Sequence, residues 1–254
     1  MAASASNTAA ESGLAISFTD VEKRYGSHVG LRRLSLTIAP GEFVALVGAN
    51  GSGKTTLLRT AALLSRPTTG KVEFESVIPN TSALTFSEIK LRIGMVGHFT
   101  MLYDELSAEE NLRFFAKLYG LNDPSRVASD ALVPAGLASR AKDLVRTFSR
   151  GMRQRLAIAR ALFAEPSILL LDEPAAGLDR EGAAWLAATL SQLRQTGATV
   201  IMSSHGQSEA LTLATRAIAM RSGALIEDSG PNGDARSIIE REAAPIAGIW
   251  GNAQ

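Results

Sequence analysis

The chain has 254 residues, of which 46% are hydrophobic and 20% charged, a composition typical of a globular protein rather than a disordered or coiled-coil chain. The absence of cysteine excludes a disulfide scaffold, a thiolate zinc site and a cysteine nucleophile. Because 26 basic residues balance 25 acidic ones, bulk charge gives no reason to expect a nucleic acid partner, and no apolar run approaches the roughly 18 residues of a membrane span.

The two ends of the chain differ in composition from its middle. Residues 1–13 are mainly small and polar, without the apolar segment of a secretory signal, so we expect a disordered tail on a cytoplasmic protein. Residues 228–254 mix Gly, Pro and Asn around a short helical pattern, Ala235–Glu242, and we expect a loosely attached C-terminal tail. One domain is therefore expected over residues 14–227.

Periodicity within that domain predicts an α/β fold. Leu34–Ile38 alternates apolar and polar residues, as in a half-buried strand of an antiparallel sheet. Helical patterns at Lys54–Leu64 and Gly182–Gln195 lie between continuous apolar runs, which suit parallel strands buried on both faces. From about residue 107 to 164 the pattern is almost entirely helical, which predicts an inserted helical subdomain. The continuous apolar runs are Phe43–Val47, Ile168–Leu171 and Thr199–Met202.

A glycine-rich segment joins the first apolar run to a helical pattern. Its sequence, Gly48-Ala49-Asn50-Gly51-Ser52-Gly53-Lys54-Thr55, has the spacing of a Walker A phosphate-binding loop between a strand and a helix. The glycines let successive backbone N–H groups point at an anion, and the N-terminus of the helix adds to the same field. We expect Lys54 to reach the β- and γ-phosphates, Thr55 to ligate Mg²⁺, and Thr56 to belong to the same binding segment. The alternative, a glycine-rich turn with a chance lysine, does not explain the flanking strand and helix.

Two carboxylates, Asp172 and Glu173, follow the buried run Ile168–Leu171. Asp172 is placed to hold Mg²⁺ through its water shell, and Glu173 to act as general base on a water molecule that attacks the γ-phosphate. An Asp-Glu pair alone is more often part of a solvated loop. At the end of a buried strand, however, two carboxylates are costly to desolvate without a cation, so the sequence predicts a magnesium–nucleotide site.

These residues, together with further segments in the same order, resemble the nucleotide-binding subunit of ATP-binding cassette (ABC) transporters over about residues Leu14 to Glu227. The resemblance implies an α/β fold: a P-loop NTPase core of mostly parallel sheet and flanking helices, with an antiparallel β subdomain and an inserted helical subdomain. It also implies ATP and Mg²⁺ as cofactors. Tyr25 is similar to the aromatic residue that stacks on adenine, although a tyrosine at a strand end needs no such role.

Phe148–Met152 resembles the signature segment of the family, which usually reads Leu-Ser-Gly-Gly-Gln. Ser149 suits the N-cap of the helical pattern that follows, and a capped helix N-terminus suits a phosphate. The resemblance implies that Ser149 and Gly151 contact the γ-phosphate bound to a second copy of the cassette. Arg150 replaces a glycine of the family and Met152 replaces the glutamine; Arg150 either adds a cation at that interface or faces solvent.

Three further residues take their roles from the resemblance alone. Asp179, in Ala176–Asp179, is similar to the D-loop aspartate, which links the two ATP sites across the dimer. His205 matches the switch histidine that contacts the γ-phosphate and the attacking water, although a histidine after a strand is commonly a surface residue. His98 stands where most of the family has a glutamine, and we expect a metal contact with a pH dependence. The alternative for His98 is a hydrogen-bonded loop residue without a catalytic part.

The resemblance implies an ATPase in which two cassettes, as a homodimer or a pair of different chains, close on two ATP molecules and drive a separate integral-membrane permease. The chain is then expected to be peripheral on the inner face of the cell membrane through that permease. Catalytic roles are expected for Lys54, Glu173 and His205.

The cargo is suggested by three short segments. Leu63–Pro67, Gly97-His98 and Glu109–Leu112 resemble the haem-exporter ATP-binding subunit of cytochrome c biogenesis. We therefore expect haem export by the complex, but no direct haem binding by this chain, because it has no Cys-x-x-Cys-His segment. The alternatives are the ATPase subunit of a multidrug or ABC-2-type exporter and a soluble ABC ATPase acting on ribosomes or DNA. A P-loop kinase would not carry the signature together with the D-loop.

Overall fold

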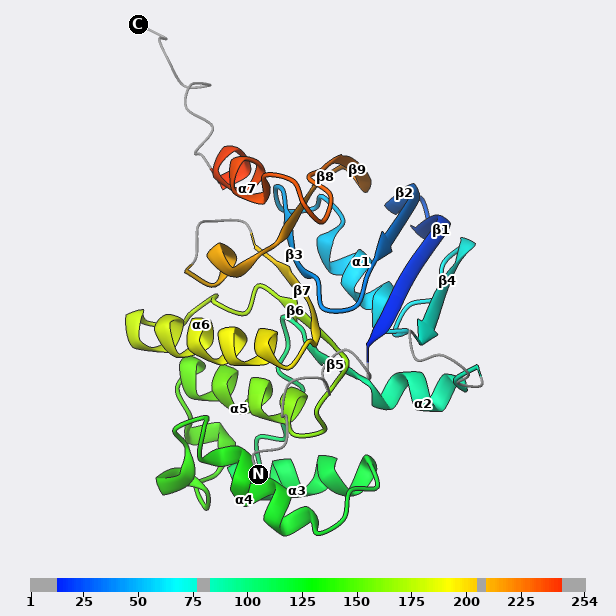
Figure 1. The fold of residues 1–254 in the computed structure, drawn as a ribbon. Coiled ribbons are helices and arrows are strands. Elements are labelled where there is room, and N and C mark those ends of the chain that lie inside the picture. The colour runs from blue at the N-terminus through cyan, green and yellow to red at the C-terminus, as the bar shows by residue number, and fades with distance from the viewer. Residues whose placement is uncertain (1–12, 77–82, 205–208, 244–254) are drawn as a thin grey trace, which may run out of the picture.

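The computed structural model describes residues 13–76, 83–204 and 209–243. A mixed sheet lies at the centre of the molecule, a smaller antiparallel sheet beside it, and a group of helices at one end (Figure 1). The predicted α/β class, with an antiparallel β part and a helical part, is confirmed. The predicted disordered tail falls, apart from Gly13, outside the described residues.

The central sheet has the strand order β5-β6-β7-β3-β8-β9, and all neighbours are parallel except the last pair. Every residue of β3, β6 and β7 is buried, which explains their continuous apolar runs. β3 has the predicted bounds, and β6 and β7 each extend one residue further. The strands are β3 (Phe43–Val47), β5 (Ile93–Val96), β6 (Ile168–Asp172), β7 (Thr199–Ser203), β8 (Arg216–Arg221) and β9 (Ala224–Asp228).

The antiparallel sheet contains β1 (Leu14–Tyr25), β2 (His28–Ile38) and β4 (Thr69–Ser76) in the order β2-β1-β4. Leu34, Leu36 and Ile38 are buried and the residues between them are exposed, as their alternation predicts. The buried side chains of this sheet form one hydrophobic cluster with α1 and with one face of the central sheet.

The described helices agree with the helical patterns, with small differences at their ends. They are α1 (Lys54–Ala61), α2 (Phe86–Leu91), α3 (Ala108–Leu118), α4 (Pro124–Leu132), α5 (Arg150–Leu162), α6 (Arg180–Gln195) and α7 (Ala235–Ala243), with 3₁₀ turns at Ala138–Arg140, Val145–Thr147 and Glu209–Leu213. Helix α1 ends before the predicted Leu64, because Leu63 has a left-handed φ of 58°. Helix α6 begins two residues early, because Asp179 caps it.

Helices α3, α4 and α5 surround a hydrophobic cluster of their own at the lower end of the molecule (Figure 1). Ser107 and Glu110 form a capping box at the start of α3, in which the Ser107 hydroxyl accepts from the Glu110 N–H and the Glu110 carboxylate accepts from the Ser107 N–H. Within 107–164 the only strand-like pairing is a single bridge between Ser107 and Leu144.

The segment after Asp228 differs from the loosely attached tail that we expected. Helix α7 packs on β8 and β3, and its Ala235, Ile238 and Ile239 are buried in the same cluster as α5 and α6. The apolar spacing of these three residues at i, i+3 and i+4 accounts for the attachment. The tail prediction was therefore wrong for Ala235–Ala243, and residues 244–254 lie outside the described part of the chain.

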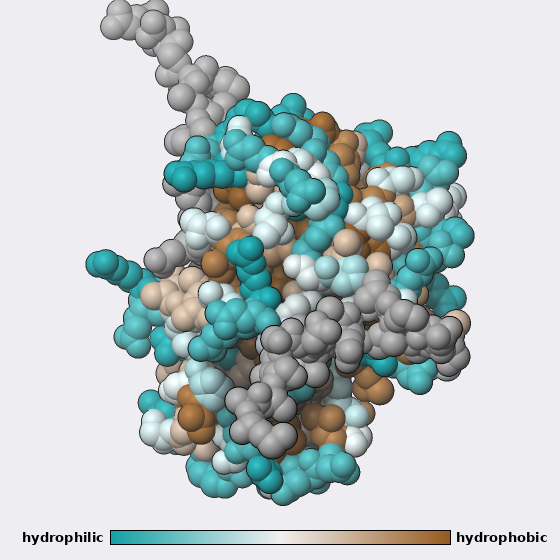
Figure 2. Space-filling model, in the orientation of Figure 1, coloured by the Kyte–Doolittle hydropathy of each residue, from teal (hydrophilic) through white to brown (hydrophobic). Residues whose placement is uncertain are grey.

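The side of the molecule shown in Figure 2 is mainly hydrophilic, with smaller hydrophobic areas, some of them at the end formed by the helices α3 and α4. Among the described residues, no helix combines the length and hydropathy needed to cross a membrane.

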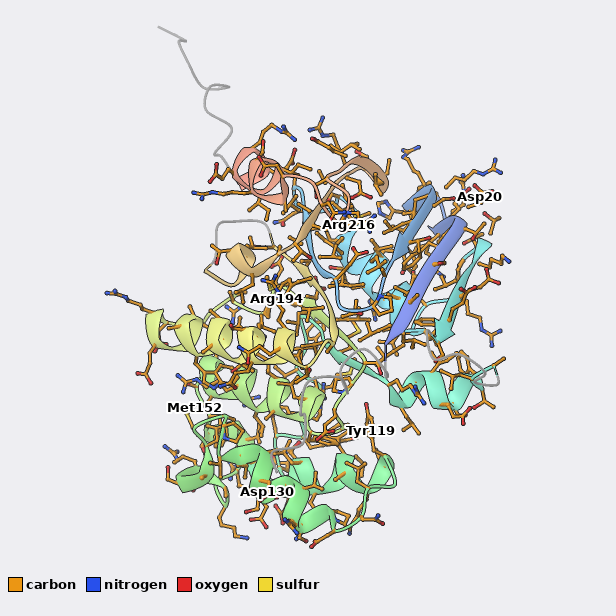
Figure 3. The ribbon with its side chains drawn as sticks, in the orientation of Figure 1. Asp20, Tyr119, Asp130, Met152, Arg194 and Arg216 are labelled. Atoms are coloured by element: carbon orange, nitrogen blue, oxygen red, sulfur yellow. The ribbon has the colours of Figure 1, made fainter. Side chains whose placement is uncertain are left out.

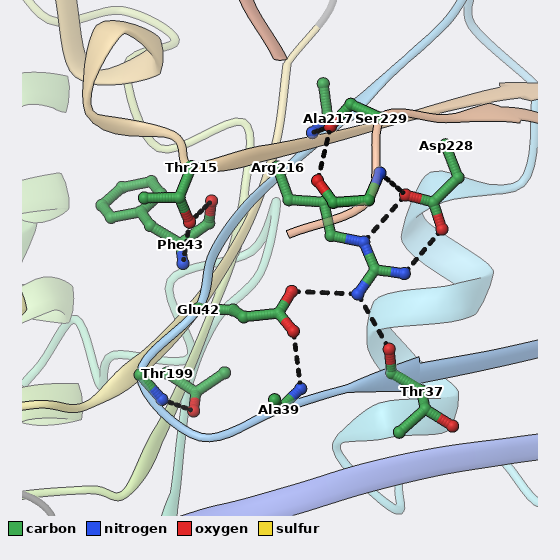
Figure 4. A network of polar contacts seen from close by, with 12 residues as sticks. Thr37, Ala39, Glu42, Phe43, Thr199, Thr215, Arg216, Ala217, Asp228 and Ser229 are labelled. Carbon is green, nitrogen blue, oxygen red and sulfur yellow. Dashed lines mark hydrogen bonds and ion pairs between the residues drawn. The ribbon is translucent and has the colours of Figure 1, made fainter. Parts of the chain in front are cut away.

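Arg216, at the start of β8, joins the two sheets through a buried ionic network (Figures 3 and 4). Its Nη1 donates to Glu42 Oε2 at 2.9 Å and to the Thr37 carbonyl at 2.8 Å. Its Nε and Nη2 donate to the two carboxylate oxygens of Asp228 at 2.8 and 2.6 Å. The guanidinium therefore ties the end of β2 and the residue before β3 to the β8–β9 hairpin.

We predict that Arg216→Met lowers the free energy of unfolding by about 3 kcal/mol, because it leaves the Glu42 carboxylate buried without a cation. Urea unfolding without nucleotide measures this change. The control is Arg33→Met, since Arg33 forms an exposed ion pair with Asp20 and should change stability by less than about 1 kcal/mol. Equal losses in the two variants would contradict the structural role of the network.

The same network predicts the acid dependence of stability. The hydrogen bonds from Arg216 lower the pKa of Asp228. A carboxyl group whose folded-state pKa is depressed stabilises the fold above its unfolded pKa of about 4 and loses that contribution as the pH falls through the folded-state value. The free energy of unfolding should thus decline below about pH 4, and less steeply in Arg216→Met.

Candidate active site

The glycine-rich segment forms a tight loop between β3 and α1, and the residues at its two ends, Gly48 and Gly53, must be glycine. Gly48 has φ +138°, and a Cβ there would lie 2.3 Å from the Met220 carbonyl oxygen. Gly53 has φ +109°, and its Cβ would lie 2.8 Å from the Gly30 carbonyl oxygen. Gly53 is also the N-cap of α1 and supplies no side-chain cap, so the first N–H groups of α1 remain available to an anion.

Lys54 is almost completely buried and turns back into this loop. Its Nζ donates to the carbonyl oxygens of Gly48 at 2.7 Å and of Ala49 at 3.0 Å. Burial lowers the pKa of the Lys54 ammonium, and the nearby carboxylates of Glu173 and Asp172 oppose that shift. The loop therefore contains a partly desolvated cation close to two acidic residues.

A cavity of about 260 Å³ lies in front of the loop. Ser52 lies against it, and the Ser52 Oγ is buried without a hydrogen-bond partner in the described part of the chain. An unsatisfied hydroxyl, a buried ammonium and a free helix N-terminus together fit the oxygens of a nucleotide phosphate. The cavity is lined by His28, Gly30, Asn50, Gly51, Ser52, Gly53, Lys54, Thr55, Thr56 and Glu173.

The two predicted carboxylates lie at the end of β6, beside this cavity. Asp172 is 4% exposed, and its Oδ1 accepts a hydrogen bond from Ser203 Oγ at 2.6 Å. Glu173 lines the cavity and has a φ of +53°, which is unusual for a residue with a side chain. In the described part of the chain no three His, Asp or Glu residues gather as a metal site, so a cation here would depend on Asp172, the Thr55 hydroxyl and the nucleotide itself.

The signature segment lies outside the cavity. Ser149 is the N-cap of α5, as predicted, and its Oγ accepts from the Met152 N–H at 3.2 Å. Asp179 caps α6 through a hydrogen bond from the Gly182 N–H at 2.8 Å. The Arg150 side chain crosses over Gly177, where an added Cβ would lie 2.3 Å from the Arg150 Nε. The signature and the D-loop segment are therefore adjacent in one chain, but neither contributes to the walls of its own phosphate cavity.

His98 lines a second cavity of about 90 Å³, together with Asp172 and Glu173, and Glu173 also lines the first cavity. Arg150, Arg153 and Gln154 also line it, and the His98 ring packs edge-on against Phe99 at 5.4 Å. The structure thus brings His98 to the two carboxylates. His205 lies outside the described residues, and its predicted role stays untested.

Tyr25 is half exposed at the end of β1. Its ring lies beside Gly30 and Thr56, since a Cβ added to Gly30 would be about 3 Å from the Tyr25 ring and about 3 Å from the Thr56 side chain. The Lys23 ammonium lies 5.0 Å from the centroid of the ring. Tyr25 is therefore next to the first turn of α1, at the border of the phosphate cavity.

Sequence reasoning missed Ser203, which contacts Asp172 and also accepts from the Glu173 N–H at 3.0 Å. The feature that could have identified Ser203 is its place as a polar residue at the end of an apolar run, which the parallel register of β6 and β7 pairs with Asp172. It also missed His28 and Gly30, which carry no motif and approach the loop only in the folded chain.

Comparisons with known proteins agree with this geometry. The family described as ABC transporter matches residues 31–176. The chain is 38% identical over 218 residues to the ABC transporter ATP-binding protein NatA of Bacillus subtilis (strain 168), with 83% of this chain and 87% of NatA covered. It is 35% identical over 243 residues to the daunorubicin resistance ATP-binding protein DrrA3 of Streptomyces coeruleorubidus, with 91% and 75% covered. A solved dimeric structure of the ATP-binding cassette MJ0796, bound to ADP and Pi, is similar with a TM-score of 0.75 and 29% identity, over 86% of this chain and 99% of that one.

These relatives correct one expectation. They give no support to the resemblance to a haem-exporter subunit, since one is named for daunorubicin resistance and none for haem. The matched family, the two relatives and the phosphate-binding fold all point to a nucleotide-hydrolysing subunit. The chain belongs to the ABC transporter family, as an ATP-binding cassette that hydrolyses ATP.

Proposed function

We propose that this cassette is the motor subunit of an exporter of the multidrug or ABC-2 type, which closes with a second cassette on ATP and drives a separate integral-membrane permease. The observation that carries the ATPase part is the pairing of the Lys54 loop with Glu173 across one cavity. The similarity to DrrA3, which is named for daunorubicin resistance, supports a drug as the cargo.

In this proposal the phosphate loop holds ATP by charge and by backbone hydrogen bonds. The Lys54 ammonium exchanges the carbonyls of Gly48 and Ala49 for the β- and γ-phosphates, the N–H groups of the first turn of α1 bind the remaining oxygens, and the Ser52 hydroxyl gains its missing partner. Tyr25 borders the cavity, and its aromatic ring offers a face on which the adenine ring stacks.

Hydrolysis depends on the two carboxylates. Mg²⁺, when bound, neutralises charge that develops on the phosphate oxygens, and Thr55 and Asp172 are the residues that would hold it, with His98 at the edge of the same site. Glu173 accepts the proton of the attacking water as general base. His205 is proposed to contact the γ-phosphate.

A second copy completes the site. Ser149 is exposed at the N-terminus of a capped helix, and Gly151 in the first turn of that helix lies close to Leu178, the neighbour of Asp179. Because these groups do not reach the phosphate cavity of their own chain, they are free to bind the nucleotide of a partner cassette. The dimeric state of the similar cassette MJ0796 supports this arrangement.

The surface that would receive the permease is formed by exposed apolar side chains of α3 and of the segment that joins β5 to α3, here called the Phe99 patch. Its members are exposed, apolar or aromatic side chains: Phe99, Met101, Tyr103, Phe114 and Leu118. Phe99 is 80% exposed, which is unfavourable in water unless a partner covers it. Because His98 packs on Phe99 and shares a cavity with Glu173, a partner on this patch is directly coupled to the carboxylates.

Glu173→Gln tests the general base. We expect ATP binding to persist and phosphate release to fall at least 100-fold, because the amide cannot accept the proton. Stopped-assay phosphate release and size-exclusion chromatography with ATP measure turnover and the trapped dimer. Glu73→Gln, which alters an exposed carboxylate of β4, is the control. Phosphate release near the wild-type rate in Glu173→Gln would refute the assignment.

Lys54→Ala tests the phosphate loop. Removing the ammonium should weaken ATP binding at least tenfold, because a charge-assisted contact to two phosphates is lost. Calorimetric titration with ATP measures the affinity. Arg59→Ala, on the exposed side of the same helix, should keep the wild-type affinity. An unchanged affinity in Lys54→Ala would argue against the site.

The permease surface is tested with the double variant Phe99→Ser and Met101→Ser. The isolated chain should hydrolyse ATP within twofold of the wild type, and copurification with a hydrophobic permease from detergent extract should be lost. Val133→Ser, which changes an exposed apolar residue at the end of α4, is the matched control. Sedimentation of the wild-type chain with ribosomes instead would overturn the transporter proposal.

A further inference from the structure

Ser203 ends β7 at the edge of the sheet where the carboxylates lie. The parallel register pairs Ser203 with Asp172, so the two side chains lie on the same face of adjacent strands. Ser203 is fully buried. A hydroxyl in this position must satisfy its hydrogen bonds within the protein.

The hydroxyl bridges two successive residues of the site. Because a carboxylate only accepts and a backbone N–H only donates, the Ser203 hydroxyl donates to Asp172 Oδ1 at 2.6 Å and accepts from the Glu173 N–H at 3.0 Å. Both hydrogen-bonding capacities of the hydroxyl are thus used on residues of the candidate active site. No described residue donates to Asp172 Oδ2, so this oxygen remains available to a hydrated cation.

The second hydrogen bond stabilises an unfavourable backbone. Glu173 adopts a left-handed φ of +53°, a conformation in which a side chain crowds its own carbonyl. The chain turns sharply here, since the Ala176 N–H donates to the Glu173 carbonyl at 3.0 Å. Holding the Glu173 N–H from β7 fixes the direction of this turn and, with it, the direction in which the Glu173 side chain leaves the backbone.

We propose that Ser203 is a positioning residue for ATP hydrolysis: one hydroxyl orients the Asp172 carboxylate for the cation and locks the strained turn that carries Glu173. This inference rests on the roles proposed above for Asp172 and Glu173. It predicts that Ser203 affects the magnesium-dependent part of nucleotide binding and the turnover step, and leaves magnesium-free binding of ATP unchanged.

The test compares Ser203→Ala with Ser203→Thr, which keeps a hydroxyl, and Ser203→Cys, which keeps the size with weaker hydrogen bonding. Thr199→Val is the matched control, because Thr199 is a fully buried residue of the same strand whose hydroxyl accepts from the Gly41 N–H, far from the carboxylates. Thermal unfolding establishes that each variant is folded. ATP affinity is measured by calorimetry in Mg²⁺ and in EDTA, and turnover by phosphate release over a series of Mg²⁺ concentrations.

For Ser203→Ala we expect at least a tenfold lower kcat, a severalfold higher half-saturating Mg²⁺ concentration, and a severalfold smaller gain in ATP affinity on adding Mg²⁺. Affinity in EDTA should stay within twofold of the wild type. Ser203→Thr should retain most of the wild-type kcat and Mg²⁺ response, and Ser203→Cys should give values between those of Ser203→Ala and Ser203→Thr. Thr199→Val should keep both kcat and the Mg²⁺ response of the wild type.

Two outcomes overturn the inference. Wild-type kcat and Mg²⁺ response in Ser203→Ala would remove the positioning role, and equal losses in Ser203→Ala and Thr199→Val would reduce it to general stability. Asp172→Asn, measured in the same assays, separates this failure from that of the proposed function. If Asp172→Asn also keeps the wild-type response, the proposed carboxylate site itself is wrong; if it loses the response while Ser203→Ala does not, only the role of Ser203 is wrong.

Discussion

The phosphate loop keeps its shape because the β8–β9 hairpin lies directly against it. The Gly223 N–H donates to the Ser52 carbonyl at 2.8 Å, and the Arg32 N–H donates to the Gly223 carbonyl at 2.7 Å. The Met220 carbonyl occupies the space beside Gly48, where no side chain would fit. At its base the same hairpin is fixed by Arg216, which reaches Glu42 at the entrance to β3. A loop whose backbone must point at an anion before the anion arrives needs such external support, since its own N–H groups cannot pair with each other.

The sequence predicted those parts of the fold and site that are encoded by neighbours along the chain. The β3 bounds, the glycine loop, Ser149 as a helix cap and Asp172 at a strand end all follow from local spacing. The parts that it did not predict depend on register between distant segments. Arg216 and Glu42 are 174 residues apart, and Ser203 meets Asp172 only through the alignment of β6 and β7. The attachment of helix α7 was not predicted, because the neighbouring residues in the sequence are mostly polar and its buried face is short, consisting mainly of Ile238 and Ile239.

The expectation of haem export is not supported by the relatives, and the structure offers a related physical reason. The segment Glu109–Leu112, which suggested a haem exporter, is the first turn of α3, where Glu110 closes a capping box. Asn111 is fully buried, accepts from the Tyr103 N–H at 2.8 Å and donates to the Tyr103 carbonyl at 3.0 Å. These residues are constrained by the helix start and the loop before it, whatever the transporter carries. Likeness at such positions reflects shared folding requirements and says little about the cargo.

The loop that carries part of the Phe99 patch is bound to the signature helix by one buried cation. Arg160, in the last turn of α5, donates through Nη1 to the carbonyls of Thr100 at 2.9 Å and Met101 at 3.1 Å, and its guanidinium lies 4.8 Å from the Phe115 ring. Burial lowers the pKa of Arg160, and since the group stays charged in proteins, the carbonyl oxygens must compensate its lost hydration. That requirement makes the contact difficult to break. Ser149 caps the start of the same helix, so Arg160 and the residue proposed to meet the nucleotide of the partner cassette lie at opposite ends of α5. If a permease docks on the Phe99 patch as proposed, α5, with a buried charge at one end and a capped N-terminus at the other, is the element that would connect its movement with ATP closure.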